Sequence, residues 1–160
     1  VEPDHLKEIF DDVGLSKMMY IHEMNTEWPT LIEMINMDKR LVVFWEQSAD
    51  SSHPYFHDFL THSWTTNYAD DDTSSMDCEK LRGDVNQPVF HMNNWLKNQA
   101  GLSDPNRAGE ANDVDFMIER AIECIDLHGK RPTFIAVDWW EEGDVVEAVE
   151  RVNLMEIEGD

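Results

Sequence analysis

The stretch that most constrains the fold of this chain is residues 131–153, RPTFIAVDWWEEGDVVEAVERVN. Its residues 133–137 form a short β-branched and apolar run, which is typical of a strand covered on both faces. Asp138 ends this run, and Asp144 with Glu147 then predicts a capping box that opens an amphipathic helix. The order of strand, acid, loop and helix places Asp138 at the carboxyl end of a strand. This is the edge at which α/β proteins bind ligands.

Length and charge limit the classes of protein to which this unit can belong. A chain of 160 residues with 41% hydrophobic content can bury one core but has no room for two ordinary domains, so we predict one domain, or part of one, over residues 1–160. The formal charge of −22 repels the phosphates of nucleic acids and argues against them as partners. No apolar run approaches the ~20 residues of a transmembrane helix.

Two more apolar runs predict buried strands, at residues 40–45 and 89–92. The three predicted strands lie about 45 residues apart, which leaves room for crossover connections and predicts that they are parallel. Each strand ends in polar residues, namely Glu46, then Asn93 and Asn94, then Asp138. Because the carboxyl ends of parallel strands meet at one edge, we expect these residues to line one common ligand-binding opening.

Helices are predicted where apolar periodicity follows a capping signal. The expected helices start at Asp4, which is followed by the stop signal Gly14, at the capping box of Thr30 and Glu33, at Pro54, and at Asn112, whose helix ends before Gly129. Residues 61–87 have no sustained period and predict a long surface loop.

Two groups of side chains invite a metal interpretation. His53 and His57 lie four residues apart beside Asp58, but no third ligand is evident, and a solvated surface pair is the favoured interpretation. The run from Asp70 to Asp72 suggests calcium, although it lacks the glycine and the distal glutamate of an EF-hand, so weak calcium binding or simple solvation is expected. No cofactor is certain, and calcium remains possible. His91 is expected to be a hydrogen-bonded core residue.

The two cysteines, Cys78 and Cys124, allow one disulfide that closes a loop of about 45 residues. The alternative is a pair of unpaired thiols in a reducing compartment. Composition alone leaves both open.

Four segments resemble a known family. RLVVFWEQSAD, WTTNYAD followed by a cysteine, VFHMNNWL and the stretch 131–153 are similar to the second half of the PLC-like phosphodiesterases, secreted relatives of phosphatidylinositol-specific phospholipase C. The resemblance extends from about Asp4 to Asn153. It implies an α/β fold in which this chain is the C-terminal half, about strands five to eight, of a (β/α) TIM-type barrel.

The resemblance also implies a phosphoric diester hydrolase that is incomplete in this chain alone. The family uses two catalytic histidines, and both would lie in the missing N-terminal half, on the same protein or on a partner chain. Asp138 matches the aspartate that orients one of them. The expected substrate-binding residues, which would contact a phosphodiester or phospholipid headgroup, are Tyr68, Trp140, Glu46 and Asn93.

Two further expectations follow from the resemblance. Secreted members pair cysteines at the places of Cys78 and Cys124, which favours the disulfide and a secreted or extracellular protein. Bacterial members carry a basic residue where this chain has Glu46. This departure supports a second reading, in which the protein is a non-catalytic, acidic binding or structural subunit of an assembly.

Overall fold

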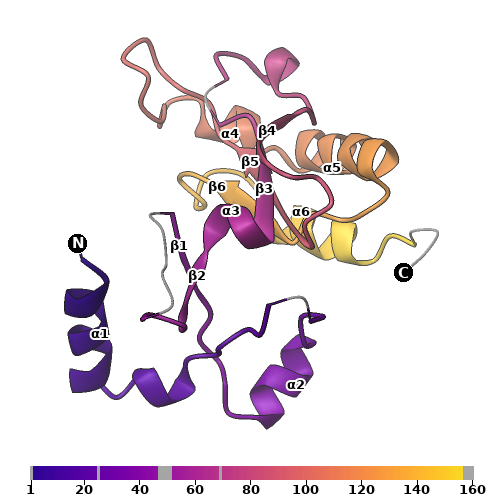
Figure 1. Cartoon of the computed structure of the whole chain (residues 1–160). Helices are drawn as coiled ribbons and strands as arrows, with labels where there is room; N and C mark the ends of the chain where they lie inside the picture. Colours follow the sequence, from indigo (N-terminus) through magenta and orange to yellow (C-terminus); the bar gives the residue numbers. More distant parts are fainter. Residues whose placement is uncertain (1, 25, 47–51, 69, 157–160) are drawn as a thin grey trace. The chain divides into compact units, whose positions relative to one another are not determined.

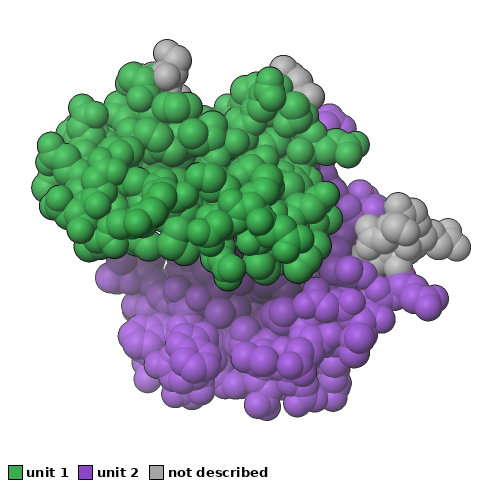
Figure 2. All heavy atoms as spheres, turned by 90° about the horizontal axis from the view of Figure 1, so that it is seen from below, with its two compact units in different colours: residues 1–62 green, residues 63–160 purple. Residues whose placement is uncertain are grey.

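The computed structural model describes residues 2–24, 26–46, 52–68 and 70–156 of the chain (Figure 1). It consists of two compact units, residues 1–62 and residues 63–160, which are coloured separately in Figure 2. Each unit has its own small sheet. None of the described helices is long and apolar enough to cross a membrane.

Unit 1 combines short helices with a parallel pair of strands. Pro3 occupies the first turn of its first helix, so the helix begins after Glu2 and Asp4 is not its cap. The expected capping box is present: Thr30 Oγ1 accepts from the Glu33 backbone N–H at 3.3 Å, and Glu33 accepts from the Thr30 N–H at 2.8 Å. The elements are α1 (Pro3–Asp12), η1 (Ser16–Met18), α2 (Leu31–Asn36), β1 (Val43–Trp45), β2 (Phe56–Asp58) and α3 (Phe59–His62).

Unit 2 is built on a four-stranded sheet of order β4-β3-β5-β6. Strands β3, β5 and β6 are parallel, and β4 runs antiparallel to β3. The expectation that strands near residues 91 and 135 are parallel is therefore confirmed. The elements are β3 (Ser63–Thr66), η2 (Thr73–Ser75), β4 (Lys80–Gly83), β5 (Val89–Asn94), α4 (Ala108–Ala111), α5 (Val114–His128), β6 (Phe134–Val137) and α6 (Val145–Asn153).

The core of unit 2 lies between one face of this sheet and the helices α5 and α6, which pack against each other. The rings of Trp64 and Phe90, on neighbouring strands, stack with centroids 3.9 Å apart. The predicted disulfide between Cys78 and Cys124 is confirmed, and it ties the segment before β4 to α5 inside this core. Burial of these side chains fixes α5 against the sheet.

The expected half of a TIM-type barrel is wrong. The described residues form one two-stranded and one four-stranded sheet, and neither closes. Two pairings explain the difference. The strand expected at 40–45 pairs, over Val43–Trp45, with β2 in unit 1 instead of joining β5 and β6. The antiparallel β4 occupies the outer edge of β3, where a (β/α) barrel requires a further parallel strand.

Candidate functional site

The candidate site of unit 2 is the edge at which its parallel strands end. Thr65 is in register with His91, and Asn93 and Asn94 are in register with Ala136 and Val137. The residues that follow each strand therefore meet at one edge, as the sequence predicted for β5 and β6. Parallel strands present their carboxyl ends at such an edge, which is where open α/β sheets bind ligands.

Strand alternation separates the two faces of β6. Ile135 packs against the helix-covered core, whereas Phe134 lies on the opposite face and is 45% exposed. The same alternation continues through Ala136 to Asp138. Asp138 therefore follows the strand on the face that the helices leave open, and it is half-buried.

Asn112 fixes the backbone at Asp138. Its fully buried side-chain amide donates to the carbonyl oxygens of Asp138 at 3.0 Å, Trp139 at 3.2 Å and Glu142 at 3.0 Å. No described residue donates a hydrogen bond to the Asp138 carboxylate itself. The main chain of the acid is thus held while its carboxylate is left to accept a hydrogen bond from elsewhere. The sequence predicted Asn112 only as a helix start and gave no sign of this role.

The loop after Asp138 is shaped by unusual backbone angles. Trp139 adopts a φ of +54°, and its indole N–H donates to Ser103 Oγ at 3.0 Å. Trp140, which we predicted as a substrate-binding residue, is 67% exposed. The helix α6 then begins after Asp144, which makes no side-chain capping hydrogen bond, so the capping box predicted there is wrong.

Gly143 allows this loop to approach Asn112. Its φ is +84°, and a Cβ atom at this position would lie 2.5 Å from the Asn112 carbonyl oxygen. We expect Gly143→Ala to lower the free energy of unfolding by ~2–4 kcal/mol, because it adds a clash to the cost of a left-handed backbone. Gly101→Ala is the matched control, since Gly101 has a φ of +78° with nothing within 4 Å of its Cβ position. Equal losses for both variants in chemical denaturation would contradict the close approach.

Arg120 of α5 links the end of β5 to the segment before β4. Its buried guanidinium donates to the carbonyl oxygens of Met76, Asp77 and Asn93 and to the side-chain oxygen of Asn94. Burial lowers the pKa of Arg120 to about 10, while nearby Asp70 opposes this shift, so the guanidinium stays charged at neutral pH. The polar ends of β5 are thereby anchored to α5.

The predicted substrate-binding residues are distributed over both units. Asn93 is buried, and its amide donates to the Thr66 carbonyl oxygen at 3.0 Å, which links β5 to β3. Tyr68 is 42% exposed, with the Arg82 guanidinium 5.4 Å from its ring centroid. Glu46 is exposed and belongs to unit 1. Their roles toward substrate stay predictions.

The carboxylates of Asp70, Asp71 and Asp72 form hydrogen bonds or ion pairs with neighbouring residues. Asp70 is buried and accepts from the Asn67 amide at 2.6 Å, and burial raises its pKa. Asp71 pairs with Lys97 at 3.5 Å, and Asp72 caps η2 by accepting from the Ser74 N–H. Across the described ranges, no group of three or more histidine, cysteine or acidic side chains is arranged to hold a metal ion.

The histidine pair of unit 1 is separated by the fold. His53 pairs with Asp4 at 2.8 Å, whereas His57 lies on β2, not on the helix expected from Pro54, and is buried. His57 forms a cluster with His22 and His62, with ring centroids 5.3 to 6.4 Å apart. The sequence missed this histidine cluster because His22 lies far from His57 and His62 along the chain, and only the fold brings it to them.

Burial lowers the pKa values of this cluster. The pKa of His57 falls to about 4 through burial and the neighbouring His62, and burial also lowers the pKa values of His22 and His62, the latter against the opposing charge of Asp58. The unfolded chain binds these protons near pH 6.5 and the folded chain does not. The stability that the neutral histidines contribute is therefore fully present above pH 6.5, and it is lost as the pH falls toward 4.

We accordingly expect the free energy of unfolding to drop by ~1–3 kcal/mol between pH 6.5 and pH 4 through this cluster. The variant His57→Gln should reduce this pH dependence, whereas His5→Gln, at an exposed position, should leave it unchanged. Thermal unfolding across this pH range measures the effect. NMR titration of His57 with a midpoint near 6.5 would contradict it.

The comparisons with known proteins bear on the whole of this arrangement. The family model PI-PLC X matches residues 1–153 of the chain. The chain belongs to the PI-PLC X family. A PI-PLC X domain-containing protein 1 from Arthroderma benhamiae is 29% identical over 137 residues, which cover 79% of this chain and 45% of that protein. No solved structure matches.

Family membership confirms the resemblance that the sequence motifs indicated. The match includes both units and ends at the last residue of α6. This PI-PLC X chain spans less than half the length of the curated relative that it matches. The remaining part of that relative has no counterpart among these residues, so the activity of a whole PI-PLC X protein is a matter for proposal.

Proposed function

We propose that this PI-PLC X chain is part of a phospholipase C-like phosphodiester hydrolase, to which it contributes Asp138 as the acid that orients a catalytic histidine. The observation that carries the proposal is the state of Asp138. Its backbone is fixed by Asn112 at the end of a parallel strand, and its carboxylate accepts no hydrogen bond from the described residues. This is the state expected of an acid whose partner lies elsewhere.

The chemistry follows from what a carboxylate does beside an imidazole. By accepting a hydrogen bond from one ring N–H, Asp138 would fix the tautomer and orientation of the histidine and stabilise the imidazolium that forms when it acts as a base. The base would deprotonate the inositol 2-hydroxyl, which attacks phosphorus. A second histidine would protonate the departing alcohol. Both histidines would belong to the part of the protein outside this chain or to a partner chain.

The other polar residues of the edge would act on the substrate. Trp140 and Tyr68 are exposed aromatic side chains on the loops that follow β6 and β3, and we propose that they contact the headgroup. Asn93 would position the edge rather than the substrate, since its amide is committed to Thr66. The disulfide supports a secreted or extracellular protein, because such bonds persist in oxidising compartments.

Glu46 favours a second candidate function. An exposed acid, where bacterial relatives carry a basic residue for the headgroup, repels a phosphodiester. The overall charge of −22 also repels a phosphodiester. On this reading the protein is a non-catalytic, acidic binding or structural subunit.

One assay separates the two candidates. The full-length protein and residues 1–160 alone are incubated with a short-chain phosphatidylinositol, and the released alcohol and inositol phosphate are quantified. The hydrolase proposal expects turnover by the full-length protein and none by the isolated chain. An inactive but folded full-length protein would favour the binding subunit, and turnover by the isolated chain would contradict the assignment of the histidines.

A further inference from the structure

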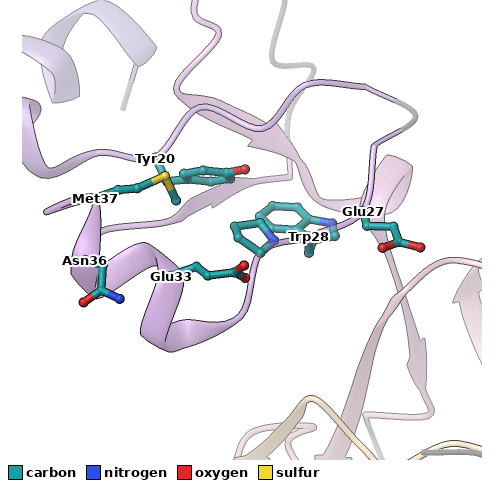
Figure 3. A pocket seen from close by; sticks show the side chains of 7 residues that line it. Tyr20, Glu27, Trp28, Glu33, Asn36 and Met37 are labelled. Carbon is teal, nitrogen blue, oxygen red and sulfur yellow. The ribbon is translucent and has the colours of Figure 1, made fainter.

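Unit 1 contains a cavity that the proposed hydrolase chemistry does not use. Its volume is about 570 Å³, and it is a shallow pocket that is largely open to solvent. The side chains come from the segment before α2 and from α2 with its C-cap (Figure 3). The lining includes Tyr20, Glu27, Trp28, Glu33, Asn36 and Met37.

Two aromatic rings form one part of the wall. The ring centroids of Tyr20 and Trp28 lie 5.9 Å apart, with the planes inclined at 44°, so they make a corner instead of a stack. Trp28 is held in place because its ring stacks on His22, with centroids 3.9 Å apart and planes at 4°. Tyr20 lies beside His57, with ring centroids 6.5 Å apart. The aromatic corner is therefore braced by the buried histidine cluster and is set before any ligand binds.

The charged groups of the cavity are all acidic. Glu33 is fixed by two hydrogen bonds from Thr30, and these lower the pKa of its carboxyl, so it stays ionised. Glu27 makes no ion pair with any residue in the described part of the chain. No lysine or arginine lines the cavity. The electrostatic potential inside it consequently attracts cations and repels phosphate.

The wall chemistry selects among cations. Calcium and magnesium bind through several carboxylate and carbonyl oxygens, whereas the carboxylates here are Glu27 and a Glu33 already bonded to Thr30, and most of the remaining wall is indole, phenol and thioether. An alkylated ammonium group needs no hydrogen-bond acceptor and is attracted to the faces of tryptophan and tyrosine. Met37 adds a polarisable apolar surface for its methyl groups. The combination of an aromatic corner with two carboxylates is the kind of site that recognises quaternary ammonium ions.

We propose that this cavity binds a free quaternary ammonium compound of the choline type. Tyr20 and Trp28 contact its methyl groups, and Glu27 and Glu33 balance its charge. The two carboxylates disfavour a ligand that carries a phosphate next to the ammonium group. A free base therefore binds more tightly than the same base within a phosphorylated headgroup. This site consists of residues of unit 1, whereas Asp138 belongs to unit 2.

The test uses the full-length protein and NMR saturation transfer from the protein to the N-methyl protons of added choline, at constant ionic strength. We expect saturable binding, with phosphocholine at least ~10-fold weaker. Glu27→Gln should weaken choline binding ~3- to 10-fold, whereas Glu23→Gln, at an exposed position of the same segment outside the cavity, should leave it unchanged. Tyr20→Leu should weaken it by ~10-fold or more.

Three outcomes would overturn the proposal. They are the absence of saturable choline binding, phosphocholine that binds as tightly as choline, and equal effects of Glu27→Gln and Glu23→Gln. Because Glu27 is exposed and unpaired, its variant remains informative even if Tyr20→Leu does not fold. None of these results depends on phosphodiester hydrolysis, so this site and the proposed function fail or stand separately.

Discussion

Replacing Arg120 by methionine is expected to lower the free energy of unfolding of unit 2 by ~3–5 kcal/mol. Arg120 is only 2% exposed, and its guanidinium donates to carbonyl oxygens at the end of β5 and in the segment before β4. Methionine fills a similar volume but donates no hydrogen bond. The carbonyl oxygens of Met76 and Asn93 would lose this donor in a buried environment, which costs more free energy than the apolar packing of methionine contributes.

The matched control is Arg151→Met on α6. Arg151 pairs with Glu147 one turn away, and about half of each side chain is exposed, so its loss should cost less than ~1 kcal/mol. Chemical denaturation of both variants under oxidising conditions measures the difference. If Arg120→Met were no more destabilising than Arg151→Met, the strand ends would not depend on the guanidinium.

Replacing Asp138 by asparagine should lower the kcat of the full-length protein by roughly 10²–10⁴-fold on a phosphatidylinositol substrate. The substitution keeps the shape of the side chain and the carbonyl oxygen that Asn112 holds. It removes the charge that would stabilise an imidazolium and reverses the preferred histidine tautomer. Folding should be almost unaffected, because the described residues make no hydrogen bond to this carboxylate.

Asp144→Asn is the control for that experiment. Asp144 lies in the same loop and makes no capping hydrogen bond through its side chain, so its variant should retain nearly full activity. Turnover within about threefold of wild type for Asp138→Asn, at an unchanged melting temperature, would show that another group orients the base.

Local signals predicted much of unit 2, and non-local contacts explain what they missed. The final strand and helix were found because their apolar pattern lies within one continuous stretch, 131–153. Strand β3 was missed inside the expected loop, because Ser63–Thr66 is short and largely polar. Its burial comes from pairing with β5, a partner about 25 residues away, and from the stacking of Trp64 on Phe90.

The same limit applies to the faces of α5. Ile122 is one of the apolar residues of this helix, yet it is 42% exposed. The buried face instead includes Arg120 and Cys124, because one reaches the end of β5 and the other is joined to Cys78. A polar anchor and a disulfide therefore belong to the buried face of this helix, and neither is visible in a helical pattern.

The candidate site divides in the same way. The place of Asp138 at the end of a strand was predicted from sequence order, since an acid directly after a buried strand is a local feature, whereas its role toward a histidine came from the family resemblance and stays a prediction. Asn112 and the histidine cluster were missed, because their roles depend on segments that only the fold brings together. The barrel expectation failed for a related reason: apolar runs predicted three strands and the resemblance implied a barrel, but neither indicated that β4 would pair with the edge of β3.

The pH dependence of kcat/KM of the full-length protein tests the central claim, that Asp138 supports a base histidine, most directly. A carboxylate beside an imidazole raises the pKa of the imidazole, so removing its charge should move the acidic limb of the profile to lower pH by about one unit in Asp138→Asn. Asp144→Asn should leave the limb in place. An acidic limb at the same pH in wild type and Asp138→Asn would contradict the account.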